Sequence, residues 1–208
     1  MRIVRLRVRG VTSSILCLVL ATALVGPPIA SVGAADFVPT TTRVSVSESG
    51  VQANGISHAS AISADGRYVA FTSSANNLSG AGQPFGDAYV KDLQTGAIES
   101  VNVSSEGVPG NSYVYPGMAI SADGRYVAFA SNANNLVDGD AVDDMYGIYV
   151  RARVGGTTEL VSTSSSGTKA DNQALYPSIS ADGRWVAFES YSTNLVAGDD
   201  NSSNDIFV

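Results

Sequence analysis

One segment of this 208-residue chain occurs three times. Residues 62–71 read ISADGRYVAF; the segment returns unchanged at 120–129, and at 179–188 with Trp in place of Tyr. The starts of successive copies are 58 and 59 residues apart. Self-similarity at a nearly fixed period of this order is typical of tandem architectures, in which each repeat is one supersecondary unit. The repeat therefore predicts a series of like structural units.

Three further markers accompany every copy in a constant order. A polar triplet that ends in Leu follows the copy, an apolar triplet centred on an aromatic residue or its equivalent comes next, and a Ser- and Val-rich segment precedes the following copy. The polar triplets lie at 76–78, 134–136 and 193–195, and the apolar triplets lie at 88–90, 148–150 and 206–208. The Ser- and Val-rich segments lie at 43–46, 100–103 and 160–163. These markers predict units near 43–98, 99–158 and 159–208, the last of them incomplete, within a domain that covers residues 36–208.

Each unit is predicted to form four short antiparallel strands. Asp-Gly pairs at 65–66, 123–124 and 182–183 stand between apolar segments, which is the strongest short-range signal for a hairpin and predicts a type I′ turn with positive φ at both residues. The strand at 68–71 is apolar at consecutive positions, so we expect both of its faces to be covered. No stretch beyond residue 35 combines helical periodicity with start and stop signals. The fold class is therefore all-β, and four-stranded antiparallel units in tandem predict the blades of a β-propeller.

The repeat resembles the WD-like repeat of TolB-type periplasmic β-propellers. In that family an aromatic or apolar residue, Ser, Pro, Asp and Gly precede a strand of the form hydrophobic-Ala-Phe, and residues 62–66 and 69–71 follow this order, as do the other copies. The departure is Ala64, Ala122 and Ala181, which stand where the family usually has Pro; we expect this to change only the stiffness of the turn entry. The resemblance implies a propeller in an envelope protein that works through protein partners. It brings no catalytic residues with it.

The number of predicted blades is smaller than in a complete ring. Propellers have four to eight blades, whereas this chain has three units, and the marker at 43–46 precedes the first of them. One explanation is that these residues are the front half of a longer gene product. The other is a homodimer that forms a six-bladed ring, in which residues 43–46 of each copy supply the missing fourth strand of its partner.

The first 35 residues have the pattern of a secretory signal peptide. Four Arg residues lie within the first nine, a mainly apolar run covers 11–25, and small residues close the segment at 32–35. We expect cleavage after Ala34 or Ala35. The uninterrupted apolar stretch is far shorter than the roughly 20 residues of a membrane span. We therefore predict a secreted, periplasmic or cell-envelope protein with no stable membrane span after cleavage.

Charge and composition disfavour several classes of function. Removal of residues 1–35 would leave 8 basic and 19 acidic residues, a net charge of −11, which repels polyanions at long range. We therefore expect no nucleic-acid partner. The single Cys excludes a disulfide framework within the chain, and one His with one Cys provides no His/Cys set for zinc.

Two loops between the second and third strands of a unit are rich in acidic residues. Clustered carboxylates are hard oxygen ligands suited to Ca²⁺, although neither loop matches the twelve-residue calcium loop with its terminal Glu. The candidate ligands are Asp138, Asp140 and Asp143 in the second unit and Asp199, Asp200 and Asp205 in the third. Asp and Asn also favour turns, and we take turn formation and solubility as the main role of these residues. We therefore predict no cofactor, with calcium as the alternative.

No constellation in the sequence predicts catalysis. His58 is the only His of the chain, and the matching positions of the other units are not His. Residues 166–169 fit the Ser-x-x-Lys pattern, but they lie in a connection whose sequence differs between units. Tyr68, Tyr126 and Trp185 occupy one position in the three copies, where we expect packing between blades rather than a ligand cage.

These observations predict a non-catalytic propeller scaffold that binds a protein, peptide or glycan through its end surfaces and variable loops. Fold-level analogy says little about function, and two alternatives remain open. The chain could be the non-catalytic portion of a propeller-containing hydrolase whose catalytic module follows Val208, or a calcium-stabilised structural module.

Overall fold

The computed structural model describes residues 41–79, 86–139 and 144–208, of which 42–208 form one compact unit. The described residues contain eleven strands and no helix, so the predicted all-β class is confirmed. The strands are β1 (Ser57–Ile62), β2 (Tyr68–Ser73), β3 (Asp87–Asp92), β4 (Ile98–Ser100), β5 (Val114–Ile120), β6 (Tyr126–Ser131), β7 (Gly147–Ala152), β8 (Thr157–Leu160), β9 (Ala174–Ile179), β10 (Val186–Ser190) and β11 (Asp205–Phe207). None of the described residues belongs to a helix that is long and apolar enough to cross a membrane.

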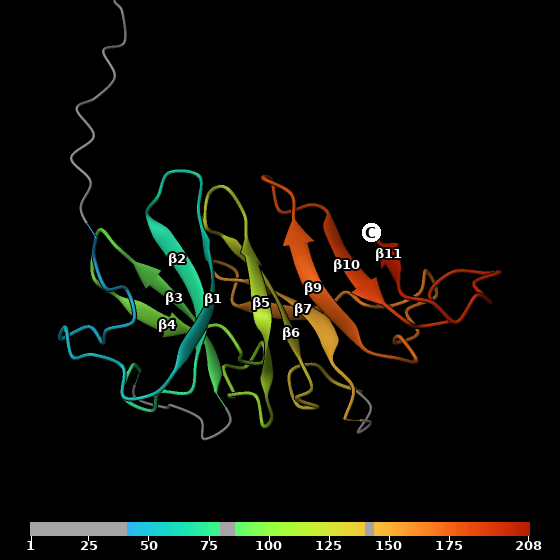
Figure 1. The fold of residues 1–208 in the computed structure, drawn as a ribbon, viewed down its shortest axis with the longest axis horizontal. Coiled ribbons are helices and arrows are strands. Elements are labelled where there is room, and N and C mark those ends of the chain that lie inside the picture. Colours follow the sequence, from blue (N-terminus) through green and yellow to red (C-terminus); the bar gives the residue numbers. More distant parts are fainter. Residues whose placement is uncertain (1–40, 80–85, 140–143) are drawn as a thin grey trace, which may run out of the picture. The chain divides into compact units, whose positions relative to one another are not determined.

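The strands form three antiparallel sheets that follow one another along the chain. β1–β4 and β5–β8 are four-stranded and ordered as in the sequence, and β9–β11 form a three-stranded sheet. Figure 1 shows the sheets one after another, with the first strands β1, β5 and β9 in contact from sheet to sheet. Four-stranded meanders that pack in series in this way are the blades of a propeller. The predicted blade architecture is confirmed, and the third blade has three strands among the described residues.

A hairpin around each Asp-Gly pair joins the first two strands of a blade, but its turn is not type I′. Gly66 donates its N–H to the Ser63 carbonyl at 2.9 Å, and Ser63 donates to the Tyr68 carbonyl at 2.9 Å. Gly66 has a φ of +73°, whereas Asp65 has no positive φ. The predicted turn type is therefore wrong: Ala64 and Asp65 are the central residues of a type I-like turn, and a left-handed Gly follows them in a longer loop.

Hydrogen bonds of the repeated Ser and Asp explain this turn. The Ser121 hydroxyl donates to the Asp123 carboxylate at 2.8 Å, and the Arg125 backbone N–H donates to the same carboxylate at 3.0 Å. These bonds, the one from Arg125 foremost, lower the pKa of Asp123 to about 2. The Ser121 hydroxyl also accepts the Tyr126 N–H at 3.0 Å. The repeated Ser-Ala-Asp-Gly motif is thus a self-contained turn.

The second strands of the first two blades are covered on both faces, as their continuous apolar sequence predicts. Every residue of 69–73 and 127–131 is buried. One core cluster, which includes Val101, Phe129 and Tyr149, joins the first blade to the second. Another, which includes Ile148 and Phe188, joins the second blade to the third. The cores therefore lie between blades.

The aromatic residue of the repeat also packs between blades. A Cβ placed on Gly124 would lie 2.3 Å from Cδ2 of Tyr68, and one on Gly183 would lie 2.3 Å from Cδ2 of Tyr126. Each Tyr ring therefore lies against the glycine of the next hairpin, which only glycine permits at this distance. The predicted packing role is confirmed for Tyr68 and Tyr126. Trp185 differs, since 61% of it is exposed.

The segment before the first blade lies against that blade. Val44 and Ala53 pack on the core cluster around Phe71. The Lys91 amine donates to the carbonyl oxygens of Val46 and Ser47 at 3.2 and 3.1 Å. The marker at 43–46 is thus anchored beside the first blade and does not pair with β11 of its own chain.

Candidate functional site

The two ends of the blades carry connections of different kinds. The hairpin end carries the Asp-Gly hairpins, which lie along the upper edge of Figure 1, and the short turns between third and fourth strands. The loop end carries the longer connections β2–β3, β6–β7 and β10–β11 and those that lead from blade to blade. Because the hairpins repeat whereas the loops differ, chemistry particular to this chain is expected at the loop end.

Three tyrosine side chains meet at the loop end of the second and third blades. Tyr115 lies in β5, Tyr176 in β9, and Tyr146 directly before β7. The ring centroids of Tyr115 and Tyr176 are 5.5 Å apart at 88°, and those of Tyr115 and Tyr146 are 5.3 Å apart at 72°. The hydroxyls of Tyr115 and Tyr176 are hydrogen-bonded at 3.0 Å. Edge-to-face contacts of this kind favour a defined arrangement of rings; we call these residues the tyrosine cluster.

Irregular strand pairing places Tyr115 and Tyr176 opposite one another. The β5–β6 register shifts between Tyr115 and Met118, and β9 pairs with β10 through Leu175 and Ser178, so that Tyr176 lies in a bulge. Tyr176 has a φ of +52°, a backbone conformation that is unfavourable for a bulky side chain. Bulges re-aim side chains and are frequent next to functional sites, and strained residues cluster at such sites.

The cluster presents neutral hydroxyls and ring surface to solvent. The hydrogen bond with the Tyr115 hydroxyl is the main cause that raises the pKa of Tyr176, and burial is the main cause that raises the pKa of Tyr146. Half of Tyr176 is exposed, and so is half of Tyr113, which precedes β5 and acts electrostatically on Tyr146. The arrangement can stack on a ligand and exchange hydrogen bonds with it.

A hollow of about 270 Å³ lies beside the first blade at the same end, lined by His58, Thr72, Asp87 and Val114 among others. Asp87 begins β3 and is 1% exposed. Its carboxylate accepts the Ser100 hydroxyl at 2.8 Å and the Ala88 N–H at 3.0 Å, yet burial outweighs these bonds and raises the pKa of Asp87 to about 6. The hollow therefore combines the only His of the chain with a buried carboxyl group.

The acidic candidates for calcium are dispersed in the described part of the chain. Asp138 is exposed, and Asp140 and Asp143 lie outside the described residues. The Asn201 amide donates to the Asp205 carboxylate at 3.0 Å, within a loop that also contains Asp199 and Asp200. The described residues contain no group of three His, Cys, Asp or Glu side chains that could hold a metal ion. Whether calcium binds stays a prediction.

The Ser-x-x-Lys segment forms a turn in the connection between the second and third blades. The Ser166 hydroxyl is hydrogen-bonded to the hydroxyls of Ser164 and Thr168 at 2.8 and 3.1 Å. Lys169 pairs with Thr163 in an isolated bridge across this turn. The segment is thus a connecting turn, as its variation between units indicates.

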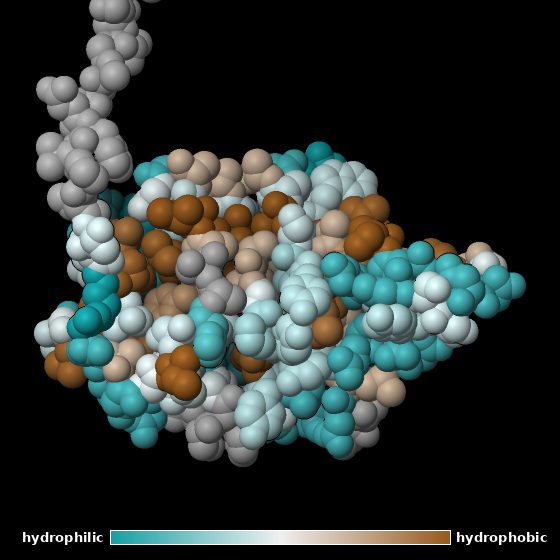
Figure 2. Space-filling view, in the orientation of Figure 1, coloured by the Kyte–Doolittle hydropathy of each residue, from teal (hydrophilic) through white to brown (hydrophobic). Residues whose placement is uncertain are grey.

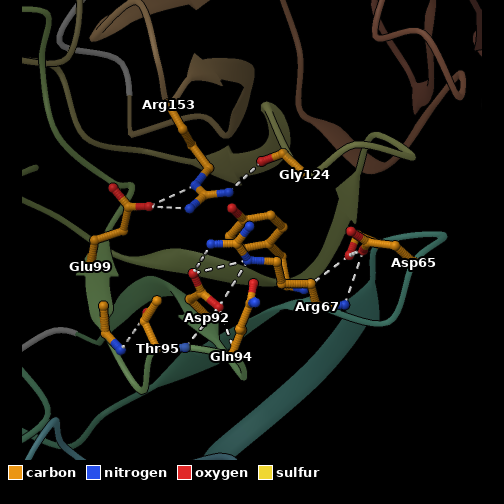
Figure 3. Close-up of polar contacts among 11 residues, drawn as sticks. Asp65, Arg67, Asp92, Gln94, Thr95, Glu99, Gly124 and Arg153 are labelled. Atoms are coloured by element: carbon orange, nitrogen blue, oxygen red, sulfur yellow. Dashed lines mark hydrogen bonds and ion pairs between the residues drawn. The ribbon is translucent and has the colours of Figure 1, made fainter.

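A second polar cluster links the first and second blades at the hairpin end (Figure 3). The Arg153 guanidinium lies 4.3 Å from the centroid of the Tyr68 ring, forms an ion pair with Glu99 at 2.6 Å and donates to the Gly124 carbonyl. Arg67 lies 4.8 Å from the same ring and pairs with Asp92 at 2.7 Å. The hydrogen bond from Arg67 holds the pKa of Asp92 well below its usual range. Because these charges pair with one another, we assign the cluster to blade packing.

The tyrosine cluster is the feature that sequence reasoning missed. A signal was present, since Tyr-Pro pairs occur at 115–116 and 176–177 near the start of two first strands. A Pro within a strand donates no ladder hydrogen bond and indicates an edge or a bulge. The repeat alignment hides the pair, because the two bulges fall at different positions of the two blades.

Comparisons with known proteins give weak similarities. No protein-family model matches the chain, and no curated protein does. The chain is similar to the crystal structure of TolB from Acinetobacter baumannii, with 16% identity over 73% of this chain and 29% of that chain and a TM-score of 0.46. It is also similar to the tricorn protease, with 18% identity over 66% of this chain and 11% of that chain (TM-score 0.45), and to an oligogalacturonate lyase in complex with manganese, with 15% identity over 74% and 35% (TM-score 0.41). The chain thus spans about a third or less of the length of these structures.

Proposed function

We propose that the chain is a non-catalytic propeller scaffold that binds a protein, peptide or glycan partner at its loop end. The tyrosine cluster is the single observation that carries this proposal. It combines half-exposed rings with hydroxyls that can donate and accept, at the end where the loops differ between blades. Tyrosine supplies rigid, amphipathic contact area at low cost in conformational entropy and is enriched in binding sites.

The strained backbone of Tyr176 supports a binding role over a purely structural one. A half-exposed ring gains little from burial within the chain, yet its φ of +52° costs free energy. A glycine at this position would relieve the strain. The presence of Tyr at this strained position is explained if its ring contacts a partner.

The proposed setting is outside the cytoplasm. Residues 1–35 have the signal-peptide pattern, and the chain after them is strongly acidic. We therefore propose a secreted or cell-envelope protein, with no nucleic-acid partner because like charges repel. A homodimer that completes the ring is proposed as a further partner arrangement, with a longer gene product as the alternative.

We propose neither enzymatic activity nor a resident cofactor. The Asp87 carboxylate in the hollow beside His58 already accepts two hydrogen bonds from its own blade. Addition of Ca²⁺ is expected to leave the Tm unchanged. A rise in Tm would instead assign a calcium-binding role to the acidic loops around Asp138 and Asp199.

Binding to a glycan array and to a peptide display library tests the proposed function. Tyr176→Gly removes a ring and keeps the positive φ, so it should weaken any loop-end binding at least about tenfold without loss of the fold. Val154→Ala is the matched control, since Val154 is 83% exposed and lies in the turn between β7 and β8 at the hairpin end.

If Val154→Ala weakens ligand binding and Tyr176→Gly does not, the ligand binds at the hairpin end, which would contradict the proposal. Tyr115→Phe separates the contributions of ring and hydroxyl. It removes the hydrogen bond to Tyr176 and keeps both rings.

A further inference from the structure

The long connections at the loop end carry negative charge only, as far as the structure describes them. Within the described parts of β2–β3, β6–β7 and β10–β11 no residue is Lys or Arg, and the charged residues are Asp138, Asp144, Asp199 and Asp200. Figure 2 shows hydrophilic residues over the loop that joins β10 and β11, which contains the last two of them. The loop end therefore has an excess of negative charge.

The hairpin end has no such excess. Each Asp-Gly hairpin carries one Asp and, two residues after it, one Arg, as in Asp65 and Arg67. In the turns β3–β4 and β7–β8, all of whose residues are described, the one charged residue is Arg153. The two ends thus differ in charge, and a cationic partner is attracted to the loop end over long range.

Two carboxylates lie near the tyrosine cluster. Asp144 precedes Tyr146 by two residues, is exposed and has a φ of +55°. Glu189 lies in β10, and its negative charge adds to the effect of the Tyr115 hydrogen bond, the main cause that raises the pKa of Tyr176. Aromatic rings and negative charges therefore occupy the same part of the loop end.

The arrangement of the rings suits a cation better than a sugar. The face of an aromatic ring carries partial negative charge and attracts ammonium and guanidinium groups. The ring planes of Tyr115 and Tyr176 stand at 88°, and those of Tyr115 and Tyr146 at 72°. Rings at such angles present their faces in different directions and form no single flat platform on which a pyranose ring stacks. Half of Tyr176 is exposed, so a side chain of a partner reaches its ring.

We propose that the partner at the loop end is a polypeptide segment rich in Lys and Arg. One cationic side chain of this segment lies against the ring of Tyr176, and its neighbours pair with the carboxylates of Asp144 and Glu189. The inference rests on the proposed function, since it names the class of partner for the same surface. Negative charges that are spread over the loops of two blades favour a segment with several cations over a single small cation.

Fluorescence anisotropy of labelled hexa-arginine and hexacitrulline with the purified protein tests the role of charge. Citrulline has the shape of arginine without its charge, so hexacitrulline should bind at least about tenfold more weakly. Added salt should weaken the binding of hexa-arginine, because it screens exposed charges. Absence of hexa-arginine binding, or equal affinities of the two peptides, would overturn the proposal.

Two substitutions of Tyr176 test the role of the ring. Tyr176→Phe and Tyr176→Leu both keep a bulky side chain on the strained backbone, but only Phe has an aromatic face. We expect Tyr176→Leu to weaken hexa-arginine binding about fivefold more than Tyr176→Phe, the effect of one cation–π contact. Equal losses would mean that the side chain provides apolar contact alone, which contradicts the proposal. Far-UV circular dichroism of both variants verifies the fold.

Asp144→Asn tests the role of the carboxylates. Asn tolerates positive φ and has nearly the shape of Asp, so the variant removes one charge and keeps the backbone conformation. We expect hexa-arginine to bind about threefold more weakly, the effect of one exposed ion pair. Glu159→Gln is the matched control, since it also removes one negative charge and Glu159 is exposed in β8, where it matches Glu99 of the hairpin-end cluster. Equal losses in the two variants would assign the binding to net charge and contradict the proposal.

The two proposals fail separately. If the ligands that Tyr176→Gly weakens are neutral peptides or glycans, the loop-end function stands and the cationic partner is wrong. If no ligand of the array or the display library responds to Tyr176→Gly, both are wrong. Peptides that the library selects through the loop end are expected to be enriched in Lys and Arg.

Discussion

The backbone N–H of Ala122 donates a hydrogen bond to the carbonyl oxygen of Ala181, 3.0 Å away, and so joins the second hairpin to the third. From the sequence we expected Ala in place of Pro to alter only the stiffness of the turn entry. The structure shows a further consequence, because Pro has no N–H and could not make this bond. Ala, unlike Pro, therefore lets neighbouring blades form a hydrogen bond at their hairpins.

Ala122→Pro tests this bond. Ala122 is the first central residue of its turn, a position where Pro fits the backbone, so the loss should come mainly from the missing donor. We expect the free energy of unfolding to fall by about 1 kcal/mol, the typical net value of such a hydrogen bond. Urea unfolding provides the measurement, and Ala122→Ser, which keeps the N–H, is the control. Equal stabilities of the two variants would show that the bond contributes nothing.

Gly124→Ala tests the contact between the glycine and the aromatic ring. The new Cβ would lie 2.3 Å from the Tyr68 ring, and φ is +71°. Gly107→Ala carries comparable backbone strain, with φ of +82°, and no neighbour within 4 Å. We expect Gly124→Ala to be less stable than Gly107→Ala by about 1–3 kcal/mol, the usual effect of overpacking. Thermal or urea unfolding of the pair measures this difference, which would vanish if Tyr68 could move aside freely.

Arg153→Met tests the cluster of Figure 3. Only 14% of the Arg153 side chain is exposed, and it binds Glu99, the Gly124 carbonyl and the Tyr68 ring together. We expect a loss of about 2 kcal/mol in the free energy of unfolding, since hydrogen bonds to charged groups are among the stronger ones. Arg125→Met is the control, because its ion pair with Asp123 is largely exposed and such pairs contribute little. Similar losses in the two variants would contradict a linking role for Arg153.

Asp87 predicts a specific dependence of stability on pH. Its pKa rises from 3.8 to about 6 on folding because burial disfavours the charged form. The folded state therefore binds more protons between these values, and the free energy of unfolding falls as the pH rises from about 4 to about 6, by about 3 kcal/mol in total for this group.

Asp87→Asn removes this contribution. The difference in stability between wild type and variant, measured by urea unfolding at pH 4 and pH 7.5, should therefore shift in favour of the variant at the higher pH. Asp138→Asn, at an exposed position, is the control variant. A pH-independent difference for Asp87→Asn would mean that its carboxyl group titrates normally in the folded protein.

The order of strands, the blade units and the packing of Tyr68 and Tyr126 between blades could be predicted from the repeat. These features follow from signals within about ten residues: an Asp-Gly pair, a strand apolar at every position, and one aromatic residue in a fixed place. These local signals are reliable here because the same signals recur in every repeat. A wrong prediction for one copy would disagree with the predictions for the other two.

The turn type is a local feature that was predicted wrongly: it is not type I′, because the Ser63 hydroxyl and the Arg67 N–H donate hydrogen bonds to the Asp65 carboxylate. Features that depend on residues far apart in the chain came from the tertiary structure alone. The tyrosine cluster arises where two bulges in different sheets bring rings 61 residues apart into contact. The sequence repeat determines the strands and the hairpin within each blade. The side-chain contacts between blades depend on bulges and on burial, which no local sequence pattern encodes.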